Sequence, residues 1–286
     1  MDLMQLRAMA KINLGLDVVR KREDGYHEVR MIMQTIRMFD RVTVYRIPEP
    51  EIRISSNLHF LPVNENNIAY KAARMMLESQ PVRGGVSISL QKRIPVAAGM
   101  AGGSADAAAV LYAMNRIFYM GYTLEELMDF GLRLGADVPY CLMRGTALAE
   151  GIGEKLTKLT PMPHCYIVVA KPPINVSTKM VYESLDSGVI TKHPDIDGII
   201  EAINEGDVKK VAERMGNVLE DVTIPMYPVI AKIKNDMLAN GAYNAMMSGS
   251  GPTVFGIFPD EQTALNCKEY LKSQEDARQV YITETF

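Results

Sequence analysis

PVAAGMAGGSAD, residues 95–106, is the stretch of this sequence that says most about its fold. Glycine and alanine dominate it. It follows a strand-like run in which Val86, Ile88 and Leu90 alternate with polar residues, and it leads into an Ala-rich run that predicts a helix to about Ile117. Glycines let a backbone approach a phosphate closely, and the first turn of a helix offers unpaired N–H groups. The stretch is therefore a candidate phosphate-binding turn between a strand and a helix.

Taken alone, the same stretch has a second interpretation. It lacks the Lys-Ser/Thr ending of a P-loop and the glycine spacing of a dinucleotide-binding turn. Small residues also serve tight packing, and the stretch fits that role about as well. The missing dinucleotide fingerprint argues against a nicotinamide- or flavin-dependent oxidoreductase.

Upstream of this turn, the sequence predicts strands. Residues 12–18 alternate strictly between apolar and polar, which predicts a strand with one buried face and with Lys11 and Asn13 on the polar face. A lysine on such a face most simply points to solvent. KREDG (21–25) predicts a turn, followed by a return strand to about Met38 and a further strand over 42–47.

The remaining elements predict an α+β protein of two domains. Helices are expected over 65–79, with Asn66 or Asn67 as N-cap, and over 123–135, with Thr123 as cap. A turn-rich segment near 155–165 predicts a boundary, giving domains 1–160 and 161–286. Beyond it we expect strands over 166–171, 245–247, 253–258 and 279–283, and helices over about 178–187, 195–204, 207–220, 228–239 and 261–273.

Composition narrows the functional classes. The 286 residues carry a net charge of −3 and show no basic cluster, which disfavours nucleic-acid binding. The three cysteines are far apart and form no CxxC pair, which indicates a reducing compartment and no structural zinc site. The most apolar stretch, residues 96–114, is rich in Ala and Gly and is a poor membrane span. We expect a soluble, cytoplasmic protein that does not associate with a membrane.

Two charged side chains could complete a phosphoryl-transfer site. A kinase needs a phosphate cradle, a cation near the transferred group and a carboxylate near the acceptor hydroxyl. Lys11 could supply the cation, and Asp137, in GADVPYC (135–141), the carboxylate. In isolation Asp137 also reads as the N-cap of a short helix. A second Gly-rich turn, SGSGPTVF (248–255), lies between two predicted strands.

Three of these segments together resemble the motifs of a known family. AKINLGLDV (10–18), PVAAGMAGGSADAAA (95–109) and SGSGPTVF (248–255) are similar, in this order, to the three motifs of the GHMP kinases. DGYHEV (24–29) and GADVPYC (135–141) resemble the branch of that family that phosphorylates cytidylated methylerythritol. The resemblance runs from about residue 7 to about residue 258.

The resemblance implies a fold and an activity. It implies the GHMP kinase fold, with an N-terminal domain like the second domain of ribosomal protein S5 and a ferredoxin-like C-terminal domain. The implied reaction is ATP-dependent phosphorylation of the C2 hydroxyl of 4-diphosphocytidyl-2-C-methyl-D-erythritol, giving the 2-phosphate and ADP in the non-mevalonate route to isoprenoid precursors. Mg²⁺ would enter with ATP, with no metal site of the protein's own, and the enzyme would be a monomer or a homodimer.

The resemblance also implies roles for particular residues. Lys11 and Asp137 would be catalytic. The substrate would bind to Asn13, Tyr26, His27 and Tyr182. The two tyrosines would stack on cytosine, and His27 would form a hydrogen bond with the base edge. The ATP phosphates would bind to Pro95, Val96, Ala97, Ala98, Gly99, Met100, Ala101, Gly102, Gly103, Ser104 and Ala105, with the Ser104 hydroxyl toward a phosphate or Mg²⁺.

Two alternatives stay open at this point. One is another GHMP kinase acting on homoserine, mevalonate or a sugar, which would have no need of the GYH segment (25–27). The other is an inactive or RNA-contacting protein on the S5-like fold, against which the acidic charge balance argues.

Overall fold

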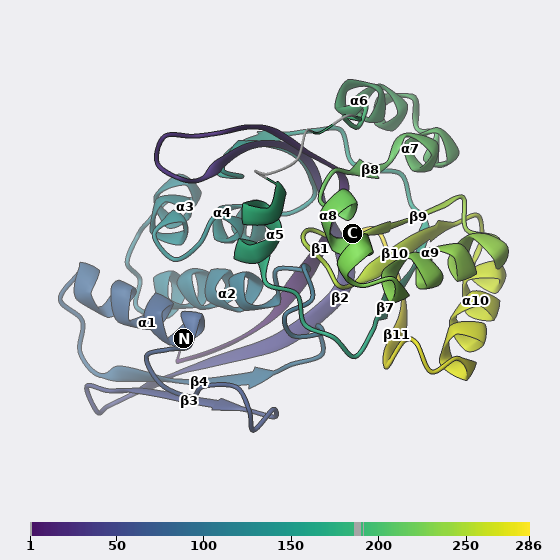
Figure 1. The fold of residues 1–286 in the computed structure, drawn as a ribbon. Coiled ribbons are helices and arrows are strands. Elements are labelled where there is room, and N and C mark those ends of the chain that lie inside the picture. The colour runs from purple at the N-terminus through teal and green to yellow at the C-terminus, as the bar shows by residue number, and fades with distance from the viewer. Residues whose placement is uncertain (1, 186–189, 191) are drawn as a thin grey trace. The chain divides into compact units, whose positions relative to one another are not determined.

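The computed structural model describes residues 2–185, 190 and 192–286 (Figure 1). These residues divide into two compact units. Of the described residues, 2–10, 38–96 and 101–144 belong to the first unit, and 11–37, 97–100, 145–185, 190 and 192–286 belong to the second. The long strands β1 (Leu3–Lys21) and β2 (His27–Ile47) contribute residues to both. The units therefore interleave along the chain, and the predicted boundary at residue 160 stays a prediction.

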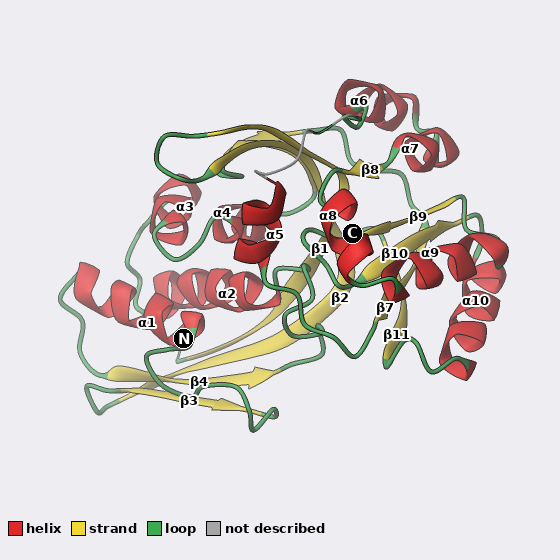
Figure 2. Cartoon of the chain, in the orientation of Figure 1, coloured by secondary structure: helices red, strands yellow, loops and turns green. Residues whose placement is uncertain are grey.

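The first unit combines sheet strands with a group of helices (Figure 2). Strand β4 (Gly85–Gln91) pairs antiparallel with β2, Val44 opposite Ile88, and β3 (Ile52–Ser56) runs parallel to β4. Helix α2, the central one, contacts each of the other three. The helices are α1 (Ile68–Ser79), α2 (Gly102–Ile117), α3 (Leu124–Leu132) and α4 (Asp137–Met143).

Local signals fix where two of these helices begin. Asn67 caps α1, since its side-chain oxygen accepts a hydrogen bond from the Ala69 N–H at 2.9 Å. Thr123 and Glu126 form a reciprocal capping box at the start of α3. The two helices predicted over 65–79 and 123–135 are confirmed, although α1 begins only at Ile68 and α3 ends already at Leu132. The Thr123 cap is confirmed, and of the two candidate caps for α1 the structure selects Asn67.

The prediction of two separate strands over 26–38 and 42–47 is wrong, because β2 runs unbroken from His27 to Ile47. The polar residue that breaks the apolar pattern, Asp40, is fully buried. It accepts a backbone hydrogen bond from Ile94 at 2.9 Å and pairs with Lys92. Partners distant in sequence thus satisfy its charge inside the strand.

The second unit contains a four-stranded antiparallel sheet in the order β11-β7-β10-β9, against which α9 and α10 pack. Strands β5 and β6 form a hairpin, β5 pairs with β2, and β8 pairs parallel with β1. The strands are β5 (Thr146–Gly151), β6 (Lys155–Lys158), β7 (Tyr166–Lys171), β8 (Gly216–Asn217), β9 (Asn244–Met247), β10 (Val254–Phe258) and β11 (Gln279–Glu284). The helices are α5 (Thr178–Leu185), α6 (Ile196–Glu205), α7 (Val208–Arg214), α8 (Glu220–Met226), α9 (Val229–Ala239) and α10 (Glu261–Ser273).

The predicted helix over 207–220 is wrong. The segment divides into α7, the short strand β8 and the start of α8. Asn217 explains the break, because its amide donates to the carbonyls of Met247 and Gly249 at 2.9 and 2.8 Å while its oxygen accepts from the Leu219 N–H. The helix predicted over 178–187 ends at Leu185, and its last two residues lie outside the described part of the chain.

Within the described residues, no helix combines the length and the apolar character needed to cross a membrane.

Candidate active site

The Gly-rich loop enters α2 through a series of left-handed backbone turns. Ala97, Gly99 and Ala101 have φ values of 51°, 70° and 55°. Ala101 is the N-cap of α2, and no side chain of the described residues makes a cap hydrogen bond to this helix end. A Cβ on Gly102 would lie 3.1 Å from Ile94 Cγ2, so the helix start packs closely on the chain that precedes the loop. The N–H groups of a first helical turn have no partner within the helix, so this helix start suits an anionic group.

Gly99 is a position where no other residue fits. A Cβ there would lie 2.1 Å from the Ser248 carbonyl oxygen, and the Ser248 hydroxyl donates to the Gly99 carbonyl at 2.9 Å. The two Gly-rich motifs, far apart in sequence, are thus in backbone contact within the second unit. SGSGPTVF therefore helps to hold the backbone of the first motif in place.

Changing Gly99 to alanine is expected to weaken the binding of an ATP analogue at least tenfold, because the added carbon forces the loop away from Ser248. Isothermal titration calorimetry measures this affinity. Gly206→Ala is the matched control, since Gly206 has a similar φ of 74° with nothing within 4 Å of its added Cβ. Equal affinities of the two variants would contradict a phosphate-binding role for the loop at Gly99.

Lys11 and Asn13 are side by side in β1, and both are buried. Their exposed fractions are 5% and 0%, and Lys11 Nζ donates to Asn13 Oδ1 at 2.8 Å. The prediction of a strand with one buried face is therefore wrong, because every residue from Ala8 to Leu16 is buried. Met31 contacts this polar face, since its sulfur accepts a hydrogen bond from Asn13 Nδ2 at 3.4 Å. Lys11 therefore does not point to solvent. Among the described residues, its buried ammonium group has one side-chain partner, the oxygen of Asn13.

Asp137 is the first residue of α4 in the first unit, and it is half-buried. The N-cap of α4 is Ala136, so Asp137 does not cap this helix by its side chain. Among the described residues, its carboxylate has no hydrogen-bond or ion-pair partner. A carboxylate without a structural role is suited to accepting a proton from a bound molecule.

Of the residues expected to bind cytosine, Tyr26 and His27 lie where the turn between β1 and β2 ends, and Tyr182 lies in α5. Tyr26 is 61% exposed at this turn. The His27 ring lies 5.0 Å from that of Tyr182 in α5, centroid to centroid, at an angle of 37°. Tyr182 follows His27 by more than half the chain, so the second unit brings together two residues that the sequence linked only by resemblance.

A buried ion cluster in the first unit escaped the sequence analysis. It comprises Asp40, Lys92 and Asp106, with exposed fractions of 0%, 8% and 3%. Burial raises the pKa of Asp106 to about 7, although Lys92 lies beside it. Asp106 ends the quoted loop motif, but nothing in the sequence marked Asp40 or Lys92 as its partners.

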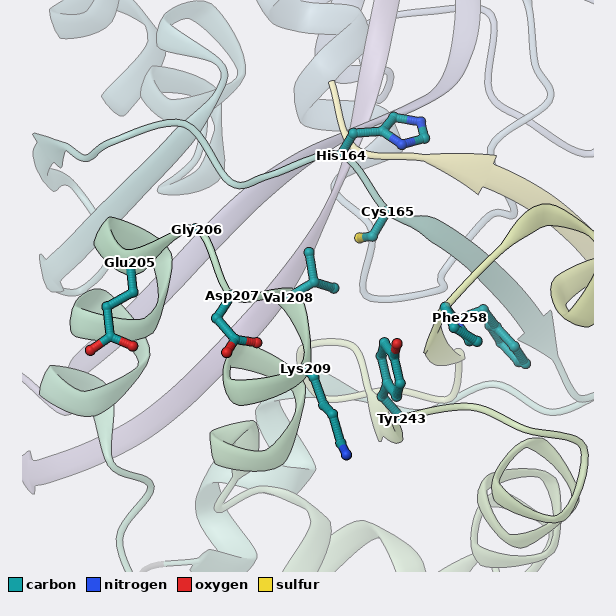
Figure 3. Close-up of a pocket in the computed structure, with 10 residues that line it drawn as sticks. His164, Cys165, Glu205, Gly206, Asp207, Val208, Lys209, Tyr243 and Phe258 are labelled. Carbon is teal, nitrogen blue, oxygen red and sulfur yellow. The ribbon is translucent and has the colours of Figure 1, made fainter.

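A separate pocket in the second unit is lined by none of the candidate site residues described above (Figure 3). It is lined by His164 and Cys165 on one side and by α7 residues, Tyr243 and Phe258 on the others. Burial raises the pKa of the Cys165 thiol to about 12, so this thiol is not a nucleophile at neutral pH. The described residues also include no group of three or more His, Cys, Asp or Glu side chains placed to hold a metal ion.

Comparison with protein families defines the class. The chain matches the model for the GHMP kinases N terminal domain over residues 67–145 and the model for the GHMP kinases C terminal region over residues 199–277. A homoserine kinase structure from Cytophaga hutchinsonii superposes with a TM-score of 0.79 at 20% identity, covering 100% of this chain and 95% of that chain. The α+β GHMP kinase fold predicted from the sequence is confirmed.

Closer relatives define the member of the class. A 4-diphosphocytidyl-2-C-methyl-D-erythritol kinase from Lachnospira eligens is 63% identical over 100% of this chain and 99% of its own length. One from Lachnoclostridium phytofermentans is 53% identical over 100% and 98%. A crystal structure of 4-(cytidine 5′-diphospho)-2C-methyl-D-erythritol kinase matches with a TM-score of 0.83 at 32% identity, covering 99% of both chains. The chain belongs to the 4-diphosphocytidyl-2-C-methyl-D-erythritol kinase family of GHMP kinases.

Proposed function

We propose that this chain transfers the γ-phosphoryl group of ATP to the C2 hydroxyl of 4-diphosphocytidyl-2-C-methyl-D-erythritol, giving the 2-phosphate and ADP. This is the step that the family contributes to the non-mevalonate route to isoprenoid precursors. The structural observation that best supports this substrate is the His27–Tyr182 ring pair next to the exposed Tyr26. Together they offer aromatic faces and a ring with hydrogen-bonding nitrogens, which is what a cytosine base needs.

The loop of residues 95–105 would hold the ATP phosphates. Its positive-φ residues turn the chain so that the uncapped start of α2 faces the anion, and the Ser104 hydroxyl adds a donor in the first turn. Partial positive charge at a helix start favours phosphate binding. When Mg²⁺ is bound with ATP, it neutralises phosphate charge, and Ser104 is the residue of this loop whose oxygen could reach it.

Asp137 would accept the proton of the C2 hydroxyl. The acceptor is a tertiary alcohol, which is hindered and weakly acidic. A carboxylate is too weak a base to deprotonate a free alcohol outright. It takes the proton as the new P–O bond forms and the alcohol oxygen becomes acidic. The lack of a structural partner for this carboxylate among the described residues supports the role.

Lys11 would stabilise the charge that develops on the transferred phosphoryl group. The ammonium is buried, and its hydrogen bond to Asn13 fixes its position before the substrate arrives. A preorganised charge in a site shielded from water acts more strongly than one in bulk solvent. That Lys11 and Asp137 meet in one active site is part of this proposal.

Removal of the Tyr26 ring tests the cytosine assignment. Tyr26→Ala is expected to raise KM for the cytidylated substrate about 10- to 100-fold with little change in KM for ATP, because stacking on a base is worth roughly 1–3 kcal/mol. Steady-state kinetics with each substrate varied in turn measures both constants. Tyr270→Ala is the control, since Tyr270 is a partly exposed tyrosine of α10. A Tyr26→Ala enzyme with both KM values unchanged would remove Tyr26 from the substrate pocket.

Product analysis tests the reaction itself. The proposal predicts a product heavier than the substrate by one phosphate, with a ³¹P signal of a phosphomonoester on a tertiary carbon. Phosphorylation at any other hydroxyl would contradict the assignment to C2. A cytoplasmic location, and a monomeric or homodimeric state, are further predictions of this function.

A further inference from the structure

Asp40, Lys92 and Asp106 lie at the two ends of the phosphate-binding loop, and all three belong to the first unit. Asp40 lies within β2, Lys92 directly follows β4, and Asp106 lies in the second turn of α2. Residues 93 and 94 are all that separate Lys92 from the loop. The cluster is buried as a whole, so it cannot contact a ligand at the protein surface.

The contacts of the cluster join both ends of the loop. Lys92 Nζ donates to Asp106 Oδ2 at 2.6 Å and also pairs with Asp40 Oδ2. Asp40 Oδ1 accepts from the backbone N–H groups of Arg93 and of Ile94, the second at 2.9 Å. Asp40 therefore fixes the chain that enters the loop, and Lys92 ties that chain to the helix that leaves it.

The backbone of Lys92 is fixed as well. Its N–H donates to Asn57 Oδ1 at 2.7 Å, and its carbonyl accepts from Asn57 Nδ2 at 3.2 Å. A Cβ on Gly102 would lie 3.4 Å from Lys92 Nζ, so the helix start packs directly on the ammonium group. The position of Lys92 Nζ thus sets how closely α2 approaches the end of β4.

Stability alone does not account for these charges. Well-packed apolar residues of similar volume stabilise a core as well as a buried ion pair does, or better. Here two carboxylates share one ammonium, and Asp106 Oδ1 has no hydrogen-bond partner within the described residues. What the cluster adds is a defined geometry. Asp40 of β2 holds the chain that enters the loop, and Lys92 joins that chain to Asp106 of α2.

We propose that Lys92, held between Asp40 and Asp106, is a positioning residue that sets the phosphate-binding geometry of the 95–105 loop. Lys92 does not touch ATP; it fixes the distance between the end of β4 and the start of α2, and so aligns the N–H groups that bind the phosphates. This inference rests on the proposed binding of ATP by the loop.

The test separates nucleotide binding from folding. Lys92→Met keeps the length of the side chain and removes its charge, and Lys71→Met, on the exposed face of α1, is the matched control. Binding of a non-hydrolysable ATP analogue with Mg²⁺ and binding of CDP are each measured by calorimetry, and Tm is measured alongside. We expect Lys92→Met to raise the Kd of the ATP analogue tenfold or more, with the Kd of CDP within twofold of the wild type.

A triple variant, Asp40→Asn/Lys92→Met/Asp106→Leu, removes the three charges of the cluster together and keeps the test decisive if the single variant does not fold. We expect it to regain much of the lost Tm while the ATP analogue still binds at least tenfold more weakly. The inference is overturned if nucleotide affinity returns with Tm, or if Lys92→Met binds the ATP analogue as the Lys71→Met control does. A wild-type protein that binds the analogue but does not phosphorylate the cytidylated substrate would contradict the proposed function and leave the Lys92 result standing.

Discussion

Replacing Asp137 by asparagine is expected to lower kcat about 10³-fold with little change in either KM. Asparagine matches aspartate in shape but cannot accept the proton of the C2 hydroxyl. General-base catalysis by a positioned side chain contributes typically about 10²–10⁴-fold, and a loss of 10³ corresponds to about 4 kcal/mol of barrier. Because Asp137 has no partner among the described side chains and is not the N-cap of α4, the substitution should leave Tm nearly unchanged.

Asp129→Asn is the control for this experiment, since Asp129 is an exposed aspartate on the neighbouring helix α3. Single-turnover kinetics show whether the chemical step itself has slowed. If Asp137→Asn turns over at a rate close to that of the control, Asp137 is not the base, and its position at the start of α4 has another explanation.

Replacing Lys11 by methionine is expected to lower kcat about 10²–10³-fold, the range for removal of one preorganised group that stabilises transition-state charge. The side chain keeps its length, so packing in the buried strand is preserved. Asn13 Oδ1 loses its 2.8 Å donor, which predicts a modest fall in Tm. Lys209→Met, an exposed lysine of α7, serves as the control.

The double variant tests whether Lys11 and Asp137 act in one site. Residues that act as a unit in catalysis are strongly non-additive. Lys11→Met/Asp137→Asn should therefore be only slightly slower than the slower single variant. Losses that multiply fully would indicate that the two side chains act independently.

Much of the fold could be predicted from the sequence because its signals are local. The capping residues Asn67 and Thr123 act within a few residues of the helices that they start. What could not be predicted depends on distant contacts. The continuity of β2 through Asp40 and the break at Asn217 both require partners that are remote in sequence.

The residues of the candidate site also fall into two groups, those that a local sequence signal marks and those that depend on distant contacts. The loop of residues 95–105 and the GYH segment stand out as motifs, because their residue types are unusual at close spacing. The burial of Lys11 was missed, because strict alternation predicts that one face of the strand is exposed to solvent. The sequence does not reveal that Met31, on another strand, contacts that face at Asn13. The Asp40–Lys92–Asp106 cluster was missed because its ion pairs span 52 and 14 residues along the chain.

The most direct test of the central claim is ADP release from Mg-ATP with 4-diphosphocytidyl-2-C-methyl-D-erythritol, and with homoserine and mevalonate as controls. We predict rapid release with the cytidylated substrate and only background release with either control. Release with homoserine or mevalonate alone would contradict the cytosine pocket at Tyr26, His27 and Tyr182. Background release with all three would contradict the assignment of this chain as an active kinase for any of these substrates.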